Sequence, residues 1–341
     1  MEKHIILSRH SIKKPKTADD SMSKEYEGIT VKGVELARQS ANNILEELKQ
    51  SPSDSVFFLG GVSDNIRTRS TARVYGDELK KLLAGKKDYV FVTEQELRTD
   101  ITKDDYIGSM FGQLKRKVDD NPGKRVIVDF PLFIKQLSKR RLGWVDDKGD
   151  DSAYATKLLE KANGNEQKAF RYWIENQGEQ VDGLKGPKPV EVAKEYQKGL
   201  NRLEQFVGKY IRNRPIVTGF VAHSWDADAF LTYVAGDGKV DLQTFDRISM
   251  SGPLMKETEM GAIKINNGTA TLTYRGQKHT RKLEHIVAAI GVIGILGALF
   301  SLSGITGNVV GASYNNPLGI ISVIVFLTAM LLYSVIREIR A

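Results

Sequence analysis

Short apolar segments alternate with amphipathic helical segments along the first 235 residues, and this alternation limits the possible folds more than any other feature. The candidate strands are five to seven residues of mainly apolar side chains, and they are residues 4–8, 55–61, 88–94, 124–130 and 217–222. Residues 31–50 carry apolar side chains at helical spacing, with Thr30 as the expected N-cap. Strands that alternate with helices predict an α/β fold with a mainly parallel sheet.

Two other segments depart from this alternation. Residues 262–274 read as a hairpin that turns at Asn266, Asn267 and Gly268. Residues 141–190 are polar and rich in Gly, Asp and Lys, with one expected helix near residues 167–176. We interpret residues 141–190 as an insertion or cap.

Charged and imidazole side chains stand where three of the candidate strands end. Arg9 and His10 follow the first strand, Arg67 comes shortly after the second, and His223 ends the strand at 217–222. Each of these residues has an ordinary explanation when it is considered alone. An arginine is common on the surface, and a histidine often makes a structural hydrogen bond. In open α/β sheets, however, ligands bind beyond the carboxyl ends of the strands, so we expect these four residues at one site.

The net charge of the chain suits an anionic partner. The formal charge is +8, and residues 286–341 contain only two Arg and one Glu, so 8 − 1 = +7 lies on residues 1–285. Phosphorylated molecules, nucleic acid and anionic lipid all fit this charge, as does a solvated basic surface without a partner. No aromatic side chains interleave with the basic ones, so we expect no nucleic-acid binding.

Several classes of site are excluded by composition or have no signal. The chain has no cysteine, which excludes disulfides, thiolate metal sites and a cysteine nucleophile. No cluster of metal-ligating residues and no Gly-rich phosphate loop stands out, so we expect neither a metal nor another cofactor.

Residues 286–305 and 318–336 are each about 20 residues long without a charge, which is the length a helix needs to cross a bilayer. The segment between them carries no Lys or Arg, whereas basic residues flank the pair, namely Lys278, Arg281, Lys282, Arg337 and Arg340. Basic residues stay on the cytoplasmic side, which predicts a multi-pass protein of the cell membrane with both termini cytoplasmic. A buried helix pair in a globular domain is the alternative.

Small residues gather in the first of these segments, and they are Gly291, Gly294, Gly297, Ala298 and Ser301. Such a face lets helices approach closely, so we expect a helical hairpin or a homodimer through this segment. No ionisable residue lies within either segment, which argues against a transport path and for an anchor in the lipid bilayer.

Four segments resemble, in order and spacing, the histidine phosphatase superfamily, whose fold is the phosphoglycerate mutase-like fold. They read LSRHS, GITVKGVELARQ, SDNIRTRSTA and FVAHS, and the resemblance covers residues 4–235. It implies a three-layer α/β/α sandwich for a catalytic domain over residues 1–276, with the cap at 141–190. Residues 277–341 would then form the membrane anchor.

The resemblance also implies roles for the residues that match its motifs. His10 would be the nucleophile that accepts a phosphoryl group, Arg9 and Arg67 would bind the phosphate, and His223 would be the second histidine of the site. Elementary chemistry agrees, because an imidazole attacks only when neutral and nearby guanidinium charge disfavours its protonation. Guanidinium groups also match phosphoryl oxygens in pairs.

Two positions depart from the family pattern. Ser11 and Ser224 stand where the family has glycine after each histidine, and we expect both to line the substrate site. The proton donor to the leaving group is also not fixed. Glu94 or Asp100 is the expected donor, with Glu96 and Asp226 as further candidates.

The expected function is a membrane-anchored phosphatase that hydrolyses a phosphorylated small molecule or phosphoprotein through a phosphohistidine. A phosphoglycerate-type mutase would use the same residues, and a catalytically inactive module that binds a phosphorylated ligand is a third reading. Lys13, Lys14 and Lys16 either face the site entrance or belong to a solvated loop.

Overall fold

The computed structural model describes residues 3–61, 65–98, 106–129, 142–145, 151–179, 181–211 and 214–282. The chain divides into two units, Met1–Ala288 and Ala289–Ala341, and all described residues belong to the first. This unit contains an eight-stranded sheet of order β3-β4-β2-β5-β1-β6-β7-β8. The strands are β1 (Lys3–Arg9), β2 (Val56–Gly61), β3 (Tyr89–Thr93), β4 (Arg125–Asp129), β5 (Ile216–Ala222), β6 (Met260–Asn266), β7 (Thr269–Tyr274) and β8 (Gln277–Lys282).

The sheet has a parallel part and an antiparallel edge. Strands β3, β4, β2, β5 and β1 run parallel to one another, whereas β6, β7 and β8 pair antiparallel beside β1. The three parallel strands β1, β2 and β5 are buried on both faces, which explains their continuous apolar runs. The predicted α/β class is therefore confirmed.

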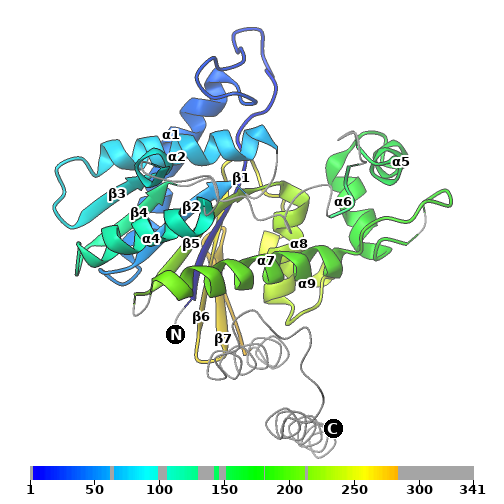
Figure 1. The fold of residues 1–341 in the computed structure, drawn as a ribbon. Helices are drawn as coiled ribbons and strands as arrows, with labels where there is room; N and C mark the ends of the chain where they lie inside the picture. The colour runs from blue at the N-terminus through cyan, green and yellow to red at the C-terminus, as the bar shows by residue number, and fades with distance from the viewer. Residues whose placement is uncertain are drawn as a thin grey trace, which may run out of the picture. The chain divides into compact units, whose positions relative to one another are not determined.

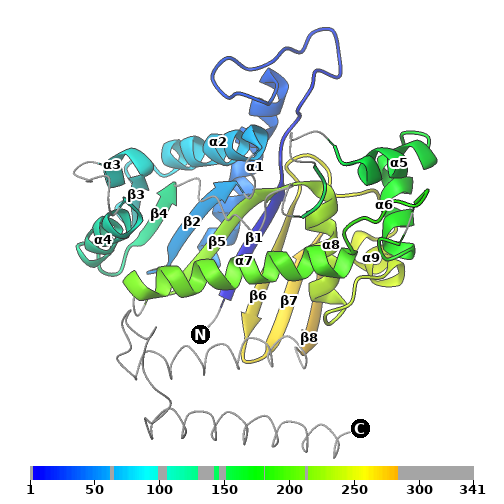
Figure 2. The same ribbon diagram turned by 45° about the vertical axis from the view of Figure 1, so that its right-hand side comes forward.

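Helices cover both faces of the sheet (Figures 1 and 2). They are α1 (Val31–Lys49), α2 (Ile66–Leu82), α3 (Glu94–Arg98), α4 (Tyr106–Asp119), α5 (Ala153–Lys161), α6 (Glu166–Glu175), α7 (Pro189–Tyr210), α8 (Ser224–Ala235) and α9 (Leu242–Ser249). One core joins α1 and α2 to the sheet, and a second joins α3, α4 and α7 to the opposite face. The layers are thus helix, sheet and helix.

Local sequence signals account for several element ends. The side chain of Thr30 accepts a hydrogen bond from the backbone N–H of Gly33 and begins α1, as the sequence predicts. The predicted hairpin at 262–274 is formed by β6 and β7, with Asn267 and Gly268 at positive φ in the turn. Strand β8 was not predicted. It pairs with β7, so the sheet continues past residue 276, where the sequence analysis ends the first domain.

Helices α5 and α6, which come between β4 and α7 in the sequence, pack against each other in the region interpreted as a cap. The predicted helix near 167–176 corresponds to α6. All three tryptophans of the chain meet at this place. The ring of Trp144 lies 4.9 Å from that of Trp173 in α6 and 5.4 Å from that of Trp225 in α8, between centroids. An aromatic cluster thus joins the cap to the start of α8.

Within the described residues, no helix is both long enough and apolar enough to cross a membrane. The two predicted membrane-spanning segments, 286–305 and 318–336, lie outside the described residues.

Candidate active site

The two histidines meet because two neighbouring parallel strands end in register. Arg9 in β1 pairs with Ala222 in β5, so the next residues, His10 and His223, leave the sheet side by side. The backbone N–H of His10 donates to the carbonyl of Ala222 at 2.9 Å. The two imidazole rings lie edge to face with their centroids 5.1 Å apart, and both side chains are buried.

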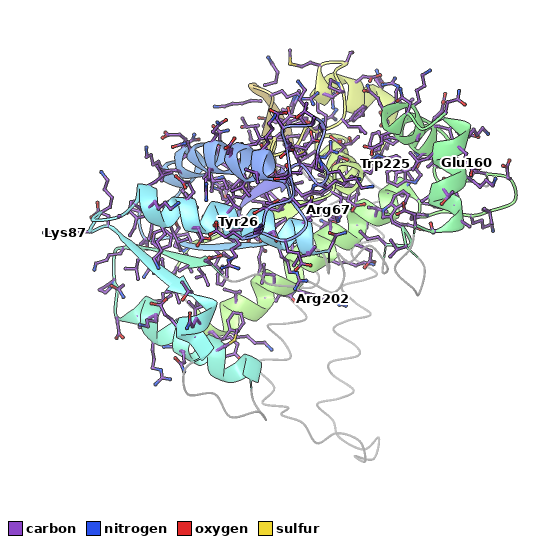
Figure 3. The ribbon with its side chains drawn as sticks, turned by 90° about the horizontal axis from the view of Figure 1, so that it is seen from above. Tyr26, Arg67, Lys87, Glu160, Arg202 and Trp225 are labelled. Carbon is purple, nitrogen blue, oxygen red and sulfur yellow. The ribbon has the colours of Figure 1, made fainter. Side chains whose placement is uncertain are left out.

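Arg67 reaches the same place from the other neighbour of β5. It lies in the first turn of α2, which follows β2, and β2 pairs with β5. At the end of β2, Gly61 lets α2 approach closely, since a Cβ there would lie 2.7 Å from the backbone nitrogen of Arg69. Figure 3 shows Arg67 on α2 toward the middle of the unit. Three adjacent strands therefore bring His10, His223 and Arg67 together.

His10 is held in one tautomer. Its Nδ1 lies 2.7 Å from the carbonyl oxygen of Ser11. A carbonyl oxygen can only accept, so Nδ1 carries the proton of the neutral ring and Nε2 keeps its lone pair. An imidazole in this state can attack an electrophile through Nε2.

The electrostatics of the site keep His10 neutral. Burial is the largest cause and lowers the pKa of His10 to about 3, with further lowering by the charges of Arg67, Arg9 and Lys13. The hydrogen bond to the Ser11 carbonyl opposes this shift. The lone pair of Nε2 is therefore available over the whole neutral and mildly acidic range.

The guanidinium groups of Arg9 and Arg67 present unused donors. Nη1 of Arg9 donates to the carbonyl of Met255 at 2.6 Å, and Nη2 lies 3.9 Å from a carboxylate oxygen of Glu166. The Nε atoms of Arg9 and Arg67 are buried and have no hydrogen-bond partner in the described part of the chain. Arg9 thus offers its Nε and Nη2 edge, which is a donor pair that matches two oxygens of a phosphoryl group.

Further charges surround the two arginines. Burial lowers the pKa of Arg67, with Arg9 adding to this and Asp151 and Glu166 opposing it. Although the side chain of Lys13 is exposed, partial desolvation followed by the charge of Arg67 lowers its pKa. Lys13 therefore lies within electrostatic reach of the site.

The ammonium of Lys16, unlike that of Lys13, forms an ion pair with Glu257, at 2.8 Å.

Ser11 and Ser224, the two predicted substrate ligands, are both buried. The hydroxyl of Ser11 donates to the carbonyl of Gly33 at 2.6 Å, and its backbone N–H donates to Oγ1 of Thr71 at 3.1 Å. Ser11 therefore ties the end of β1 to α1 and α2. Ser224 is the first residue of α8, directly after His223, and its role as a ligand stays a prediction.

The candidates for the proton donor differ in how they can be placed. Asp100 lies outside the described residues, and for Glu94 only its position at the start of α3 is described. A carboxylate oxygen of Glu96 accepts hydrogen bonds from the backbone and side chain of Thr93. Asp226 is buried and accepts a hydrogen bond of 2.8 Å from Nε1 of Trp144. The donor therefore remains a prediction for Glu94 or Asp100.

Three partners of the site were not predicted from the sequence. They are the Met255 carbonyl, Glu166 and Asp151. A backbone carbonyl contributed by a loop 246 residues away leaves no signal in the sequence. Glu166 and Asp151 leave no signal either, because it is the fold that brings them near Arg9 and Arg67. Among the described residues, no group of three or more His, Cys, Asp or Glu side chains is arranged to hold a metal ion.

The depressed pKa of His10 predicts a specific loss of stability in acid. Between pH 6.5 and about 3 the unfolded chain binds a proton at His10 that the folded chain does not bind. The free energy of unfolding should therefore fall on acidification through this window, by about 2 kcal/mol at pH 5. Urea titrations of the wild type and of His10→Asn at pH 7 and pH 5 measure it. The wild type should lose more stability than the variant, and equal losses would contradict the assignment.

Comparisons with known proteins complete the description. No protein-family model matches the sequence, and a search of curated proteins finds no match. Among solved structures, a mycobacterial glucosyl-3-phosphoglycerate phosphatase is similar at 15% identity and a TM-score of 0.37, covering 77% of this chain and 91% of the other. A phosphoserine phosphatase from Entamoeba histolytica is similar at 14% identity and a TM-score of 0.32, covering 76% and 90%. A phosphoglycerate mutase from Plasmodium falciparum is similar at 13% identity and a TM-score of 0.27, covering 82% and 97%. At these values the similarities carry no argument about function.

Proposed function

We propose that this protein is a phosphatase that hydrolyses phosphomonoesters through a phosphohistidine on His10. The observation that carries the proposal is a buried, neutral His10 with the lone pair on Nε2, beside two arginines whose Nε donors have no partner among the described residues. A core imidazole in a structural role needs no such neighbours, and unpaired buried guanidinium nitrogens are costly. An anion with several oxygens would satisfy both arginines at once.

The proposed reaction has two steps. In the first, Nε2 of His10 attacks phosphorus, the N–P bond forms, and the P–O bond to the leaving group breaks. Arg9 and Arg67 neutralise the charge on the phosphoryl oxygens, and the leaving oxygen takes a proton from Glu94 or Asp100. In the second, water attacks phosphorus and gives a proton back to the same carboxylate, the N–P bond breaks, and inorganic phosphate leaves with His10 restored. His223, whose ring meets that of His10, completes the phosphate site.

We further propose that the C-terminal part anchors this unit to a membrane. The support is the sequence alone, since residues 286–305 and 318–336 are free of charge and basic residues flank them. The catalytic unit and both termini would then face the cytoplasm.

The proposal is tested with the full-length chain purified in mild detergent. It should release phosphate from an aryl phosphate, and brief reaction with a ³²P-labelled substrate should leave label on the protein that is lost in acid and retained in alkali. Transfer of the label to an added alcohol acceptor in preference to water would favour the mutase. Binding of inorganic phosphate without turnover of any ester would favour the inactive binding module. Turnover without protein-bound label would overturn the histidine intermediate.

A further inference from the structure

A chain of two hydrogen bonds connects Arg9 to a buried carboxyl group in α8. Nη1 of Arg9 donates to the carbonyl of Met255 at 2.6 Å, and the N–H of Met255 donates to Oδ2 of Asp228 at 2.9 Å. Met255 and Asp228 are completely buried. Both main-chain polar groups of one residue are therefore used between the arginine and the carboxyl group.

The segment that contains Met255 is also held at other points. The backbone N–H of Arg9 donates to the carbonyl of Glu259, and the N–H of Thr258 donates to the carbonyl of Arg9, each at 3.1 Å. Arg275 pairs with Glu259 at 2.7 Å and donates to the carbonyl of Pro253 at 2.9 Å. The Met255 carbonyl is thus a fixed acceptor.

Burial of the Asp228 carboxyl group is costly in folding free energy. Burial raises its pKa to about 7, which the Met255 N–H, Arg275 and Arg9 oppose and Glu259 reinforces. Its Oδ1 is buried and has no hydrogen-bond partner in the described part of the chain. A buried carboxyl group with one unpaired oxygen costs stability, so stability does not explain it, and such groups are candidates for function.

We propose that Asp228 is a positioning residue that fixes the Arg9 guanidinium for phosphoryl recognition through the two main-chain groups of Met255. Because Nη1 is held by the Met255 carbonyl, the opposite edge, formed by Nε and Nη2, is turned to the ligand. Misplacement of a recognition group by about 1 Å costs on the order of 100-fold in rate. The inference rests on the proposed function, but the affinity for phosphate can test it even if the protein does not hydrolyse phosphate esters.

The test is a double-mutant cycle on the full-length chain, with Asp228→Ala, Arg9→Lys and both together. Two quantities are measured, the affinity for inorganic phosphate and kcat/KM for an aryl phosphate. Asp228→Ala should reduce both by roughly 10- to 100-fold when Arg9 is present. On the Arg9→Lys background, the same change should have no effect beyond about twofold, because a lysine cannot bridge Met255 and a phosphate at once.

Two further variants serve as controls for this cycle. Asp228→Asn keeps an acceptor for the Met255 N–H without the charge, so the variant should fold. Its phosphate affinity and kcat/KM should fall only several-fold, and only when Arg9 is present. Tyr233→Phe removes another hydrogen-bonding group from α8, a hydroxyl that donates to Oε1 of Gln197 in α7 at 3.1 Å, and should change neither quantity.

The outcomes separate the inference from the proposed function. Losses that add in the double variants would mean that Asp228 acts through the stability of the core, and this would overturn the inference even if the wild type is an active phosphatase. Coupling in phosphate affinity with no turnover in any variant would support the inference and remove the proposed function.

Discussion

Replacing His10 by asparagine should abolish turnover of phosphate esters, with kcat lowered by roughly 10⁴-fold or more. The change removes Nε2, the only atom of this side chain with an available lone pair. Asparagine is a poor nucleophile and cannot form a stable phosphoryl adduct, so no labelled protein should form either. Phosphate release from an aryl phosphate and trapping of ³²P on the protein measure the two effects.

The control for this variant is a buried histidine within β1, the strand that His10 follows. His4 lies in β1 beside Glu47, with its Nε2 3.4 Å from a carboxylate oxygen, at the end of the strand opposite to His10. His4→Asn should keep kcat within about threefold of the wild type, since it perturbs β1 without touching the site. Equal activity in His10→Asn and His4→Asn would refute the role of His10.

Arg67→Ala is expected to have the second largest effect, lowering kcat/KM by about 10³-fold or more, in the range measured when a transition-state arginine is removed. Arg67→Lys should recover only a small part of the kcat/KM lost in Arg67→Ala, because an ammonium is a point charge and cannot hold two phosphoryl oxygens in a plane. Steady-state kinetics with one aryl phosphate at fixed ionic strength would measure both variants.

The stability of Arg67→Ala separates a functional arginine from a structural one. Within the part of the chain that the structure describes, the buried Nε of Arg67 has no partner, and burial and then Arg9 lower the pKa of Arg67, so its charge does not help the chain to fold. The variant should unfold at the same or a higher urea concentration than the wild type. Arg125→Ala is a useful contrast, because Arg125 donates to the carbonyl of Ser51 at 2.6 Å, and its loss should lower stability and leave kcat/KM nearly unchanged. Loss of stability in Arg67→Ala with normal turnover would contradict our assignment.

The sequence predicted most of the elements that place the site, because their signals are local. Continuous apolar runs identified β1, β2 and β5, and the cap residue Thr30 identified the start of α1. The residues at the ends of the strands could be assembled because parallel strands end at one edge. Strand β8 was missed because its residues, QKHTRK, are polar and mostly exposed, so no periodicity marks them.

What could not be predicted depends on contacts between distant segments. The tautomer of His10 depends on the carbonyl of Ser11, and the orientation of Arg9 depends on Met255. Ser11 was expected to bind substrate, yet its hydroxyl is used by Gly33, a contact that only the approach of α1 creates. No role was predicted for Asp228, because an aspartate in a helix is usually exposed and only the fold shows that this one is buried.

The tryptophans give this protein its own optical reporter. Trp144, Trp173 and Trp225 are the whole indole content of the chain and lie within one aromatic cluster, with Trp225 two residues after His223. Figure 3 shows Trp225 on the side of the cap helices. Tryptophan emission, as distinct from that of the 12 tyrosines, therefore comes from the junction of the cap with α8. Binding of phosphate beside His223 should therefore change the tryptophan emission, which can be followed in a titration without a dye or an engineered label.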